Sequence, residues 1–376
     1  MKKKIGLITF HRSYNCGSLL QAYALQKIVD GLGYDSEFVN FSSLGQREMY
    51  KPFKKNNNFK NLIKNFGILL VYPKVKNNIK QYQKFIKQYL NVGKSDYYLL
   101  NQLEHLKYNA VISGSDQVWN ITIPDSDDAY FLPWVCNGGK IAYAVSFGAK
   151  NINKISKFED KYAQFIKNFD AVSTREFNGR KWIKELANVD APVVLDPTLL
   201  LNIEDYNIIE DKQIYYPRNY IFYYSPSYNK NINALVKQIS AKYNLPVICF
   251  NTKSFFSSGA YLNGFKLPKY ESPASYLSLI HNAELVITTS FHGTIFSSIY
   301  KKKFWTIKNG DMYGDDDRVL TLVNELHLEN RLISMNFNSN FDYMQCVDYS
   351  QYYTQLSNLK FFSLHFLSNA LSKYCI

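Results

Sequence analysis

A histidine stands where a buried strand is expected to lead into a helix. The sequence Ser-Phe-His-Gly-Thr at 290–294 follows a β-branched apolar run at 284–289, and residues 294–300 continue with helical spacing. His292 is therefore expected at the carboxyl end of a strand, the edge of an open α/β sheet where ligands bind and where helix N–H groups favour anions. A histidine that only caps the helix would give the same pattern, so position alone does not establish a role.

Three further polar loops are expected at the carboxyl ends of strands. Residues 15–18 offer Gly and Ser at a helix start, where N–H groups can hold an anion, although an ordinary N-cap explains them equally well. Residues 114–120 are rich in hydrogen-bonding groups and contain Trp119, which suits a sugar-binding pocket or a place in the core. Arg175 is a permanent cation suited to phosphate or carboxylate; a surface ion pair with Glu176 is the alternative.

These loops belong to an alternation of strands and helices that predicts parallel sheets covered on both faces. A first series of strands is expected at 4–10, 36–41, 109–113, 140–146, 171–174 and 192–195, with helices ending near residue 29 and at 154–169 and 178–187. The polar stretch from Asp196 to Arg218 is interpreted as a linker. A second series has strands at 220–224, 246–250, 284–289 and 304–307, helices at 231–243 and 272–280, and a helical tail at 353–374.

The positive charge of the chain is concentrated in one insert. The net charge is +13, and residues 51–94 contain eleven lysines without one Asp or Glu, so the rest of the chain carries only +2. Two amphipathic patterns, at 59–69 and 75–89, predict helices there. Nucleic acid, an anionic membrane and an anionic substrate are all candidate partners for this insert, and a solvated lysine face is the alternative.

Length and composition limit the remaining possibilities. A chain of 376 residues predicts two domains. Its five cysteines are scattered without metal-binding or disulfide spacing, so we expect no metal site and a reducing, cytoplasmic location. The run at 5–10 is only six residues long, too short for the apolar region of a signal peptide, and no run approaches the length of a membrane span, which leaves a soluble or peripheral protein.

Taken together, the motifs resemble those of the polysaccharide pyruvyltransferase family. NxGS, LQAYAL, GSDQVWN, STRE, LDPT and SFHG occur in this order and are followed by Arg318 and residues 326–331, so the resemblance runs from about Lys4 to Arg331. It implies two Rossmann-like domains in a GT-B-like arrangement with an interdomain cleft. We expect these domains at 1–200, including the basic insert at 51–94, and at 215–345, followed by a helical tail at 346–376.

The resemblance also implies a reaction, the transfer of the pyruvyl group of phosphoenolpyruvate onto sugar hydroxyls of a cell-surface polysaccharide precursor to form a pyruvate ketal. Phosphoenolpyruvate is then the donor substrate, no cofactor is expected, and the acceptor is a sugar, with a lipid-linked oligosaccharide as one form of it. Contact with the inner face of an anionic membrane is a further expectation for the insert, and nucleic acid is not expected as a partner.

Carried over by motif, His292 would be the catalytic residue and Arg175 would bind the phosphate or carboxylate of phosphoenolpyruvate. Family members often have an arginine where this chain has Ser290, so Arg318, Arg12 or a lysine would have to compensate for the missing charge. The full set of expected substrate-binding residues is Asn15, Gly17, Ser18, Ser115, Asp116, Gln117, Trp119, Ser146, Glu176, Ser290, Gly293, Thr294 and Arg318.

Two other classes of protein fit parts of the sequence. A GT-B nucleotide-sugar glycosyltransferase would share the architecture, but such enzymes often present a glutamate near the donor ribose, and residues 293–307 contain no acid. A basic membrane-binding or nucleic-acid-binding protein would use the insert alone. Because the polar loops lie elsewhere in the chain, binding through the insert is better suited to assisting an enzyme than to replacing it.

Overall fold

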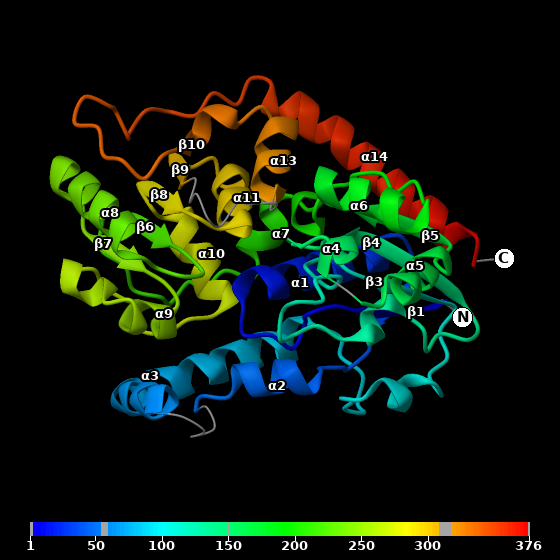
Figure 1. Cartoon of the computed structure of the whole chain (residues 1–376). Helices are drawn as coiled ribbons and strands as arrows, with labels where there is room; N and C mark the ends of the chain where they lie inside the picture. Colours follow the sequence, from blue (N-terminus) through cyan, green and yellow to red (C-terminus); the bar gives the residue numbers. More distant parts are fainter. Residues whose placement is uncertain (1–2, 54–58, 149, 156, 308–316, 375–376) are drawn as a thin grey trace.

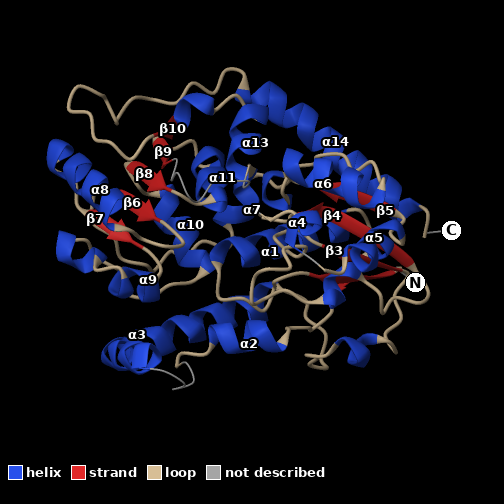
Figure 2. Cartoon of the chain, in the orientation of Figure 1, coloured by secondary structure: helices blue, strands red, loops and turns tan. Residues whose placement is uncertain are grey.

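The chain folds into two α/β domains, each built on one five-stranded parallel sheet (Figures 1 and 2). The computed structural model describes residues 3–53, 59–148, 150–155, 157–307 and 317–374. Two parallel sheets flanked by helices confirm the predicted α/β class.

The first sheet has the strand order β2-β1-β3-β4-β5, and all neighbouring strands are parallel. β3 is buried along its whole length and β1 along all but its first residue, because helices cover both faces of the sheet. The strands are β1 (Lys4–Ile8), β2 (Asp35–Phe38), β3 (Ala110–Ser113), β4 (Gly139–Val145) and β5 (Ala171–Thr174).

The second sheet has the order β10-β9-β8-β6-β7 and is also parallel throughout. β6, β8 and β9 are four-residue apolar runs without an exposed residue, as the sequence predicts for central strands. The strands are β6 (Ile221–Tyr224), β7 (Val247–Cys249), β8 (Leu285–Thr288), β9 (Phe304–Ile307) and β10 (Leu332–Ile333).

Helices connect the strands and cover the sheets (Figure 2). The helices of the first half are α1 (Cys16–Gly31), α2 (Leu44–Tyr50), α3 (Phe59–Tyr89), α4 (Ile152–Ile155), α5 (Glu159–Lys167), α6 (Phe177–Ala187) and α7 (Ile203–Asn207). Those of the second half are α8 (Lys230–Tyr243), α9 (Thr252–Ser257), α10 (Pro273–His281), α11 (Phe291–Ile299), α13 (Arg318–Glu325) and α14 (Tyr352–Ser372). The single helix predicted at 154–169 is therefore two helices, α4 and α5.

The basic insert forms one long helix instead of the two predicted from its two apolar patterns. α3 runs through Pro73, although proline removes one helical hydrogen bond. Its second half buries Val75, Tyr82 and Phe85, and Figure 1 shows the helix lying along the lower edge of the molecule beneath both domains. In its first half Leu62, Phe66, Leu69 and Leu70 are each more than half exposed.

α3 also connects the two domains through polar contacts. The Tyr82 hydroxyl lies 3.1 Å from Cys16 Sγ at the start of α1. On the other side, Asn78 Nδ2 donates to Thr252 Oγ1 at 3.1 Å, and Asn78 Oδ1 accepts the Glu271 N–H at 2.9 Å. The insert is therefore an integral part of the domain interface.

Residues 192–195 do not form the strand that the sequence predicts. Only Val193 makes an isolated bridge with Thr174, with hydrogen bonds from Thr174 N–H to Pro192 O and from Val194 N–H to Thr174 O. The segment nevertheless runs beside β5, and it places Asp196 at the same sheet edge. The following stretch, interpreted as a linker, contains α7 and packs into the core through Tyr206.

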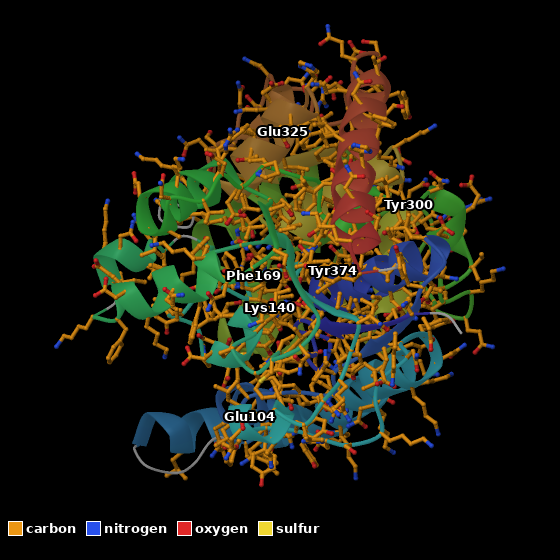
Figure 3. The ribbon with its side chains drawn as sticks, turned by 90° about the vertical axis from the view of Figure 1, so that its right-hand side faces the viewer. Glu104, Lys140, Phe169, Tyr300, Glu325 and Tyr374 are labelled. Atoms are coloured by element: carbon orange, nitrogen blue, oxygen red, sulfur yellow. The ribbon has the colours of Figure 1, made fainter. Side chains whose placement is uncertain are left out.

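The predicted helical tail is α14, which crosses the top of the molecule from the second domain to the first (Figure 1). Ser363 Oγ accepts the Leu195 N–H at 3.0 Å. Beyond the helix, the Tyr374 ring lies against Gly139 at the start of β4, and Figure 3 shows Tyr374 near Lys140. The tail thus packs on the first domain.

One hydrophobic cluster is continuous across the domain interface. It includes Leu7 of β1 and Ile112 of β3 together with Phe222 of β6 and Val286 of β8. Each sheet also has a smaller hydrophobic cluster of its own on its other face. Among the described residues, no helix has both the length and the apolar character needed to span a bilayer.

Candidate active site

Four polar loops from the two domains meet in one cluster. Gly17 lies in the first turn of α1 after β1, Asp116 follows β3, Arg175 follows β5, and His292 lies in the first turn of α11 after β8. The two domains pack closely at Gly17, where an added Cβ atom would lie only 2.2 Å from His292 Nδ1. The carboxyl edges of both sheets therefore face this point, as expected for a ligand site in parallel α/β domains.

Arg175 is buried, and its terminal nitrogens bind two carboxylates. Nη1 donates to Asp196 Oδ2 at 2.8 Å and Nη2 to Asp116 Oδ1 at 3.2 Å, while Nε lies 3.9 Å from Glu176 Oε2. The guanidinium lies over the Phe291 ring at 4.5 Å from its centroid. Because the planar guanidinium has fixed donor directions, Arg175 is well suited to hold Asp116 and Asp196 in place.

His292 is held between the Asp196 carboxylate and the backbone of α1. Its Nε2 lies 3.5 Å from Asp196 Oδ2, longer than a well-formed hydrogen bond, and has no hydrogen-bond partner among the described residues. The same carboxylate oxygen accepts from Arg175, and Ser115 Oγ lies 3.2 Å from it. With Nε2 directed to the carboxylate, the second ring nitrogen, Nδ1, lies beside Gly17.

Two of the carboxylates in this cluster are held in the ionised form. Burial alone would raise the pKa of Asp196, but His292 and Arg175 together hold it well below its usual range. Burial likewise opposes ionisation of Asp116, whose pKa is lowered by Arg175, by His292 and by a hydrogen bond from Ser18. At neutral pH, His292 therefore faces fixed negative charge.

The pKa of Glu176 shifts in the opposite direction, because the effect of burial outweighs that of the nearby arginines. The pKa of this carboxyl is raised to about 7, even though Arg175 and Arg318 act in the opposite direction. Its Oε1 accepts the Phe147 N–H at 2.9 Å, and its Oε2 has no hydrogen bond to a described residue. Glu176 and Ser146 are both expected to bind substrate, but both are completely buried. Glu176 instead lies beside the buried Arg175 guanidinium.

Asp196 occupies the centre of the cluster, yet sequence analysis gave it no role. Its Oδ1 accepts the Thr198 N–H at 3.1 Å and the Thr198 hydroxyl at 2.7 Å, which fixes the carboxylate. The residue was interpreted as the start of a linker because Pro197 follows it. The pattern that could have revealed it is an Asp directly after an apolar run, within the LDPT motif.

Asn15 and Ser18 have defined structural partners at the start of α1. Asn15 is the N-cap, and its Oδ1 accepts the N–H groups of Gly17 at 2.9 Å and Ser18 at 3.3 Å. Ser18 Oγ donates to Asp116 Oδ2 at 2.6 Å. The capping interpretation therefore describes Asn15, whereas Ser18 orients the carboxylate that Arg175 binds from the other side.

At the start of α11, Ser290 is the N-cap and accepts the Gly293 N–H at 3.3 Å. Gly293 has no room for a side chain, since a Cβ atom would lie 2.2 Å from Thr288 Oγ1. Thr294 is buried, and its Oγ1 donates to Ser290 O at 3.0 Å. These residues hold the helix start that carries His292.

The structure places Trp119 in the core, away from any surface that could meet a sugar. The side chain has no exposed area and stacks on Phe131, with ring centroids 5.1 Å apart and an interplanar angle of 9°. Its Nε1 donates to Tyr130 O at 3.4 Å. Gln117 lies two residues earlier in the same loop. Its Oε1 accepts a hydrogen bond from Asn120 Nδ2 at 3.0 Å, which stabilises the turn.

A cavity of about 350 Å³ lies between the domains beside this cluster. It is lined by Asn15 and Cys16 at the start of α1 and, from the second domain, by Tyr224 and Asn251 at strand ends. His292 is not part of its lining, but Gly17, which contacts the imidazole, directly follows Cys16. A ligand that contacts Cys16 in this cavity would therefore lie next to Gly17, the residue that packs against His292.

The sequence model of the family described as polysaccharide pyruvyl transferase matches residues 15–311, which include all four loops of the cluster. The chain belongs to the polysaccharide pyruvyl transferase family. The family suspected from the motifs is thereby confirmed. No curated protein sequence matches the chain significantly.

Solved structures similar to this family member include two UDP-GlcNAc 2-epimerases. The UDP-GlcNAc 2-epimerase of Methanocaldococcus jannaschii is 12% identical, with a TM-score of 0.50 over 97% of this chain and 93% of that one. The UDP-GlcNAc 2-epimerase of Neisseria meningitidis is 10% identical, with a TM-score of 0.49 over 98% and 99%. At this identity the first likeness concerns the fold alone, and with the two parallel sheets it confirms the GT-B-like, two-domain arrangement.

Proposed function

We propose that this polysaccharide pyruvyl transferase moves the pyruvyl group of phosphoenolpyruvate onto two hydroxyls of a sugar, which forms a pyruvate ketal. The observation that carries the proposal is the position of His292. Its Nε2 faces the ionised Asp196, and its Nδ1 lies at the start of α1 beside the interdomain cavity. A histidine held in this way is suited to transfer protons to and from a bound substrate.

The reaction requires protons to move at three points. The enol methylene takes a proton, a sugar hydroxyl attacks the resulting cationic carbon, and the first C–O bond forms as that hydroxyl loses its proton. Phosphate then departs, and a second sugar hydroxyl closes the ketal and releases its proton. His292 Nδ1 would donate or accept these protons, while Asp196 holds Nε2 and stabilises the imidazolium that forms in the process.

The donor is an anion, and the amino ends of two helices favour its binding. α1 begins at Cys16 and α11 at Phe291, and their first turns meet where Gly17 contacts His292. Asn15 accepts the N–H groups of Gly17 and Ser18 and Ser290 accepts that of Gly293, so the partial positive charge at this point comes from the helix dipoles. Arg318, at the start of α13, is close enough to lower the pKa of Glu176 and is a candidate for the charge that Ser290 does not supply.

We also propose that the acceptor is a lipid-linked sugar reached at an anionic membrane surface. Leu62, Phe66, Leu69 and Leu70 on the first half of α3 are each more than half exposed, and the insert that carries them has eleven lysines and no acid. Apolar side chains among lysines suit the interface of an anionic bilayer. Co-sedimentation with anionic vesicles, lost at high salt and in the Phe66→Ser/Leu70→Ser variant, would support this contact; unchanged sedimentation of the variant would contradict it.

The transfer itself is tested by measuring phosphate release from phosphoenolpyruvate together with ketal formation on a sugar acceptor. Wild type should catalyse both in equal amounts, and His292→Ala should lower kcat by about 10²- to 10⁴-fold while phosphoenolpyruvate affinity stays within threefold. His11→Gln is the control, since this histidine is buried, stacks on Phe38 and has its pKa lowered to about 3 by burial. Preference for a nucleotide sugar as donor would overturn the assignment.

A further inference from the structure

A cavity of about 780 Å³ lies under the insert, outside the His292 cluster. It is bounded by α3, by α2 and by the loops that follow β1 and β2, so it opens at the carboxyl edge of the first sheet. This edge is where parallel α/β domains bind ligands, and the volume is large enough for a nucleotide or a sugar diphosphate.

The lining of this cavity is strongly basic. Arg12, Arg47, Lys51, Lys76 and Lys87 line it, and no Asp or Glu is among the described lining residues. The two arginines approach an acid outside the lining, with Arg47 Nη2 2.6 Å and Arg12 Nη2 4.0 Å from Asp96 Oδ1.

Lys51 pairs with Glu48 at 2.6 Å. Lys76 and Lys87 form no ion pair with any residue that the structure describes, although both line the cavity. Their positive charge is therefore available to an anionic ligand.

Two buried side-chain amides in the cavity lining, those of Asn40 and Gln46, indicate that the ligand carries hydrogen-bond donors as well as negative charge. Asn40 and Gln46 both line the cavity and are more than nine-tenths buried. Within the described part of the chain, Asn40 Oδ1 and Gln46 Oε1 have no hydrogen-bond donor. A buried acceptor without a donor is costly, and sugar hydroxyls or a base N–H would supply one.

The basic cavity adjoins the interdomain cavity. Tyr14, Tyr50 and Ile79 line both, so the two spaces share one wall. Asn15 and Cys16 line the interdomain cavity, and the next residue, Gly17, contacts the His292 imidazole. A ligand anchored in the basic cavity can thus extend toward the proposed proton donor.

We propose that this basic cavity binds the diphosphate of an activated acceptor, a sugar diphosphate ester whose sugar extends into the interdomain cavity. The inference rests on the proposed pyruvyl transfer, since it identifies the substrate whose hydroxyls His292 would serve. Lys76 and Lys87 bind the phosphate oxygens, and Tyr14 and Tyr50, which line both cavities, lie between the diphosphate and the sugar. A nucleoside diphosphate and a polyprenyl diphosphate share this chemistry.

Calorimetry on the full chain tests the site with inorganic pyrophosphate as the probe. The variant Lys76→Gln/Lys87→Gln should weaken pyrophosphate binding at least tenfold. The matched control Lys80→Gln/Lys84→Gln removes the same charge from exposed residues of the same helix, outside the cavity lining, and should change the affinity less than threefold. Equal losses in both variants, or no binding by wild type at physiological salt, would overturn the assignment.

Competition with phosphoenolpyruvate separates this inference from the proposed function. Phosphoenolpyruvate should bind both lysine variants as it binds wild type and should not displace pyrophosphate; displacement would make the cavity a donor site and end the proposal. If phosphoenolpyruvate fails to bind at all while pyrophosphate binding depends on Lys76 and Lys87, the pyruvyl transfer fails and the diphosphate site stands. Uridine diphosphate and farnesyl diphosphate distinguish the two carriers, and binding of neither would overturn the assignment to an activated acceptor.

Discussion

Asp196 Oδ2 is shared by His292 and Arg175, with Nε2 of the histidine at 3.5 Å and Nη1 of the arginine at 2.8 Å. Arg175 follows β5 of the first domain and His292 lies in the first turn of α11 of the second, so one carboxylate joins the two halves of the proposed site. Asp196 itself is fixed by Thr198 and has no exposed side-chain area. The orientation of His292 therefore depends on Asp196, a residue whose own side chain is fully buried.

The first prediction concerns this carboxylate. Asp196→Asn keeps the shape of the side chain but removes the negative charge that faces Nε2, so kcat should fall about 100-fold or more, with less than a threefold change in KM for phosphoenolpyruvate. Steady-state kinetics with both substrates measure the split. Asp190→Asn is the control, because Asp190 pairs with Lys184 at the surface and its loss should leave the kinetics unchanged. Normal turnover by Asp196→Asn would remove Asp196 from the mechanism.

Substitution of Arg175 distinguishes a positioning role from donor binding. Because Arg175→Ala leaves Asp116 and Asp196 buried without their cation, we expect the free energy of unfolding to fall by roughly 3 to 5 kcal/mol and kcat to fall with it. Urea denaturation measures the first effect, and calorimetry with phosphoenolpyruvate measures donor affinity. Arg175→Lys, which keeps the charge but loses the two-pronged geometry, should recover part of the stability. A tenfold loss of donor affinity with unchanged stability would favour the direct donor contact expected from the motif.

The sequence predicted the four loops because they depend on local patterns. Apolar runs of strand length ending in Gly, Ser or Asp place His292, Arg175 and Asp116 at sheet edges without knowledge of the fold. The partners of Arg175 could not be predicted in the same way. They come from residues 59 positions earlier and 21 positions later in the chain, and burial of a guanidinium between carboxylates depends on tertiary packing.

The basic insert at 51–94 is a second case in which local sequence patterns do not predict the tertiary packing. Its two apolar patterns predicted helical structure correctly, and Pro73 separates them in sequence, yet one helix runs through both. Packing of Val75 and Tyr82 and the hydrogen bonds of Asn78 fix the second half against both domains. Such long-range contacts outweigh the cost of a proline in the helix, which local pattern alone cannot show.

The pKa of Glu176 gives a prediction for stability as a function of pH. Burial raises this pKa to about 7 in the folded protein, whereas an unfolded glutamate titrates near 4.3. The folded state then binds more protons than the unfolded state between these values, so this group lowers stability as the pH rises from about 4.5 to 7. Glu176→Gln should lose less stability between pH 5 and 8 than wild type does.

Urea denaturation of both proteins at several pH values in this range measures the effect. Glu185→Gln is a control in α6, the helix that Glu176 precedes, because the exposed Glu185 pairs with Lys181 at the surface. It should follow the wild-type curve. Parallel curves for Glu176→Gln and wild type would mean that Glu176 is already ionised across this range.

The last prediction concerns the contact between the two domains at Gly17. A methyl group there would lie 2.2 Å from His292 Nδ1 and 2.6 Å from Cγ, closer than atoms can pack, so Gly17→Ala must displace the imidazole or separate the first turns of α1 and α11. Either movement changes the distance from His292 to Asp196, and kcat should fall by at least tenfold even though alanine favours helix. The measurement is kcat together with the melting temperature.

Gly31→Ala is the matched control. Gly31 is the last residue of the same helix and has open space around its Cα, so alanine there should leave kcat unchanged and alter stability by no more than about 1 kcal/mol. A Gly17→Ala enzyme as active as Gly31→Ala would show that the imidazole position is not critical, and the role proposed for His292 would then be wrong. A drop in kcat confined to Gly17→Ala, at a melting temperature within a few degrees of wild type, would link the rate to the contact between the two domains.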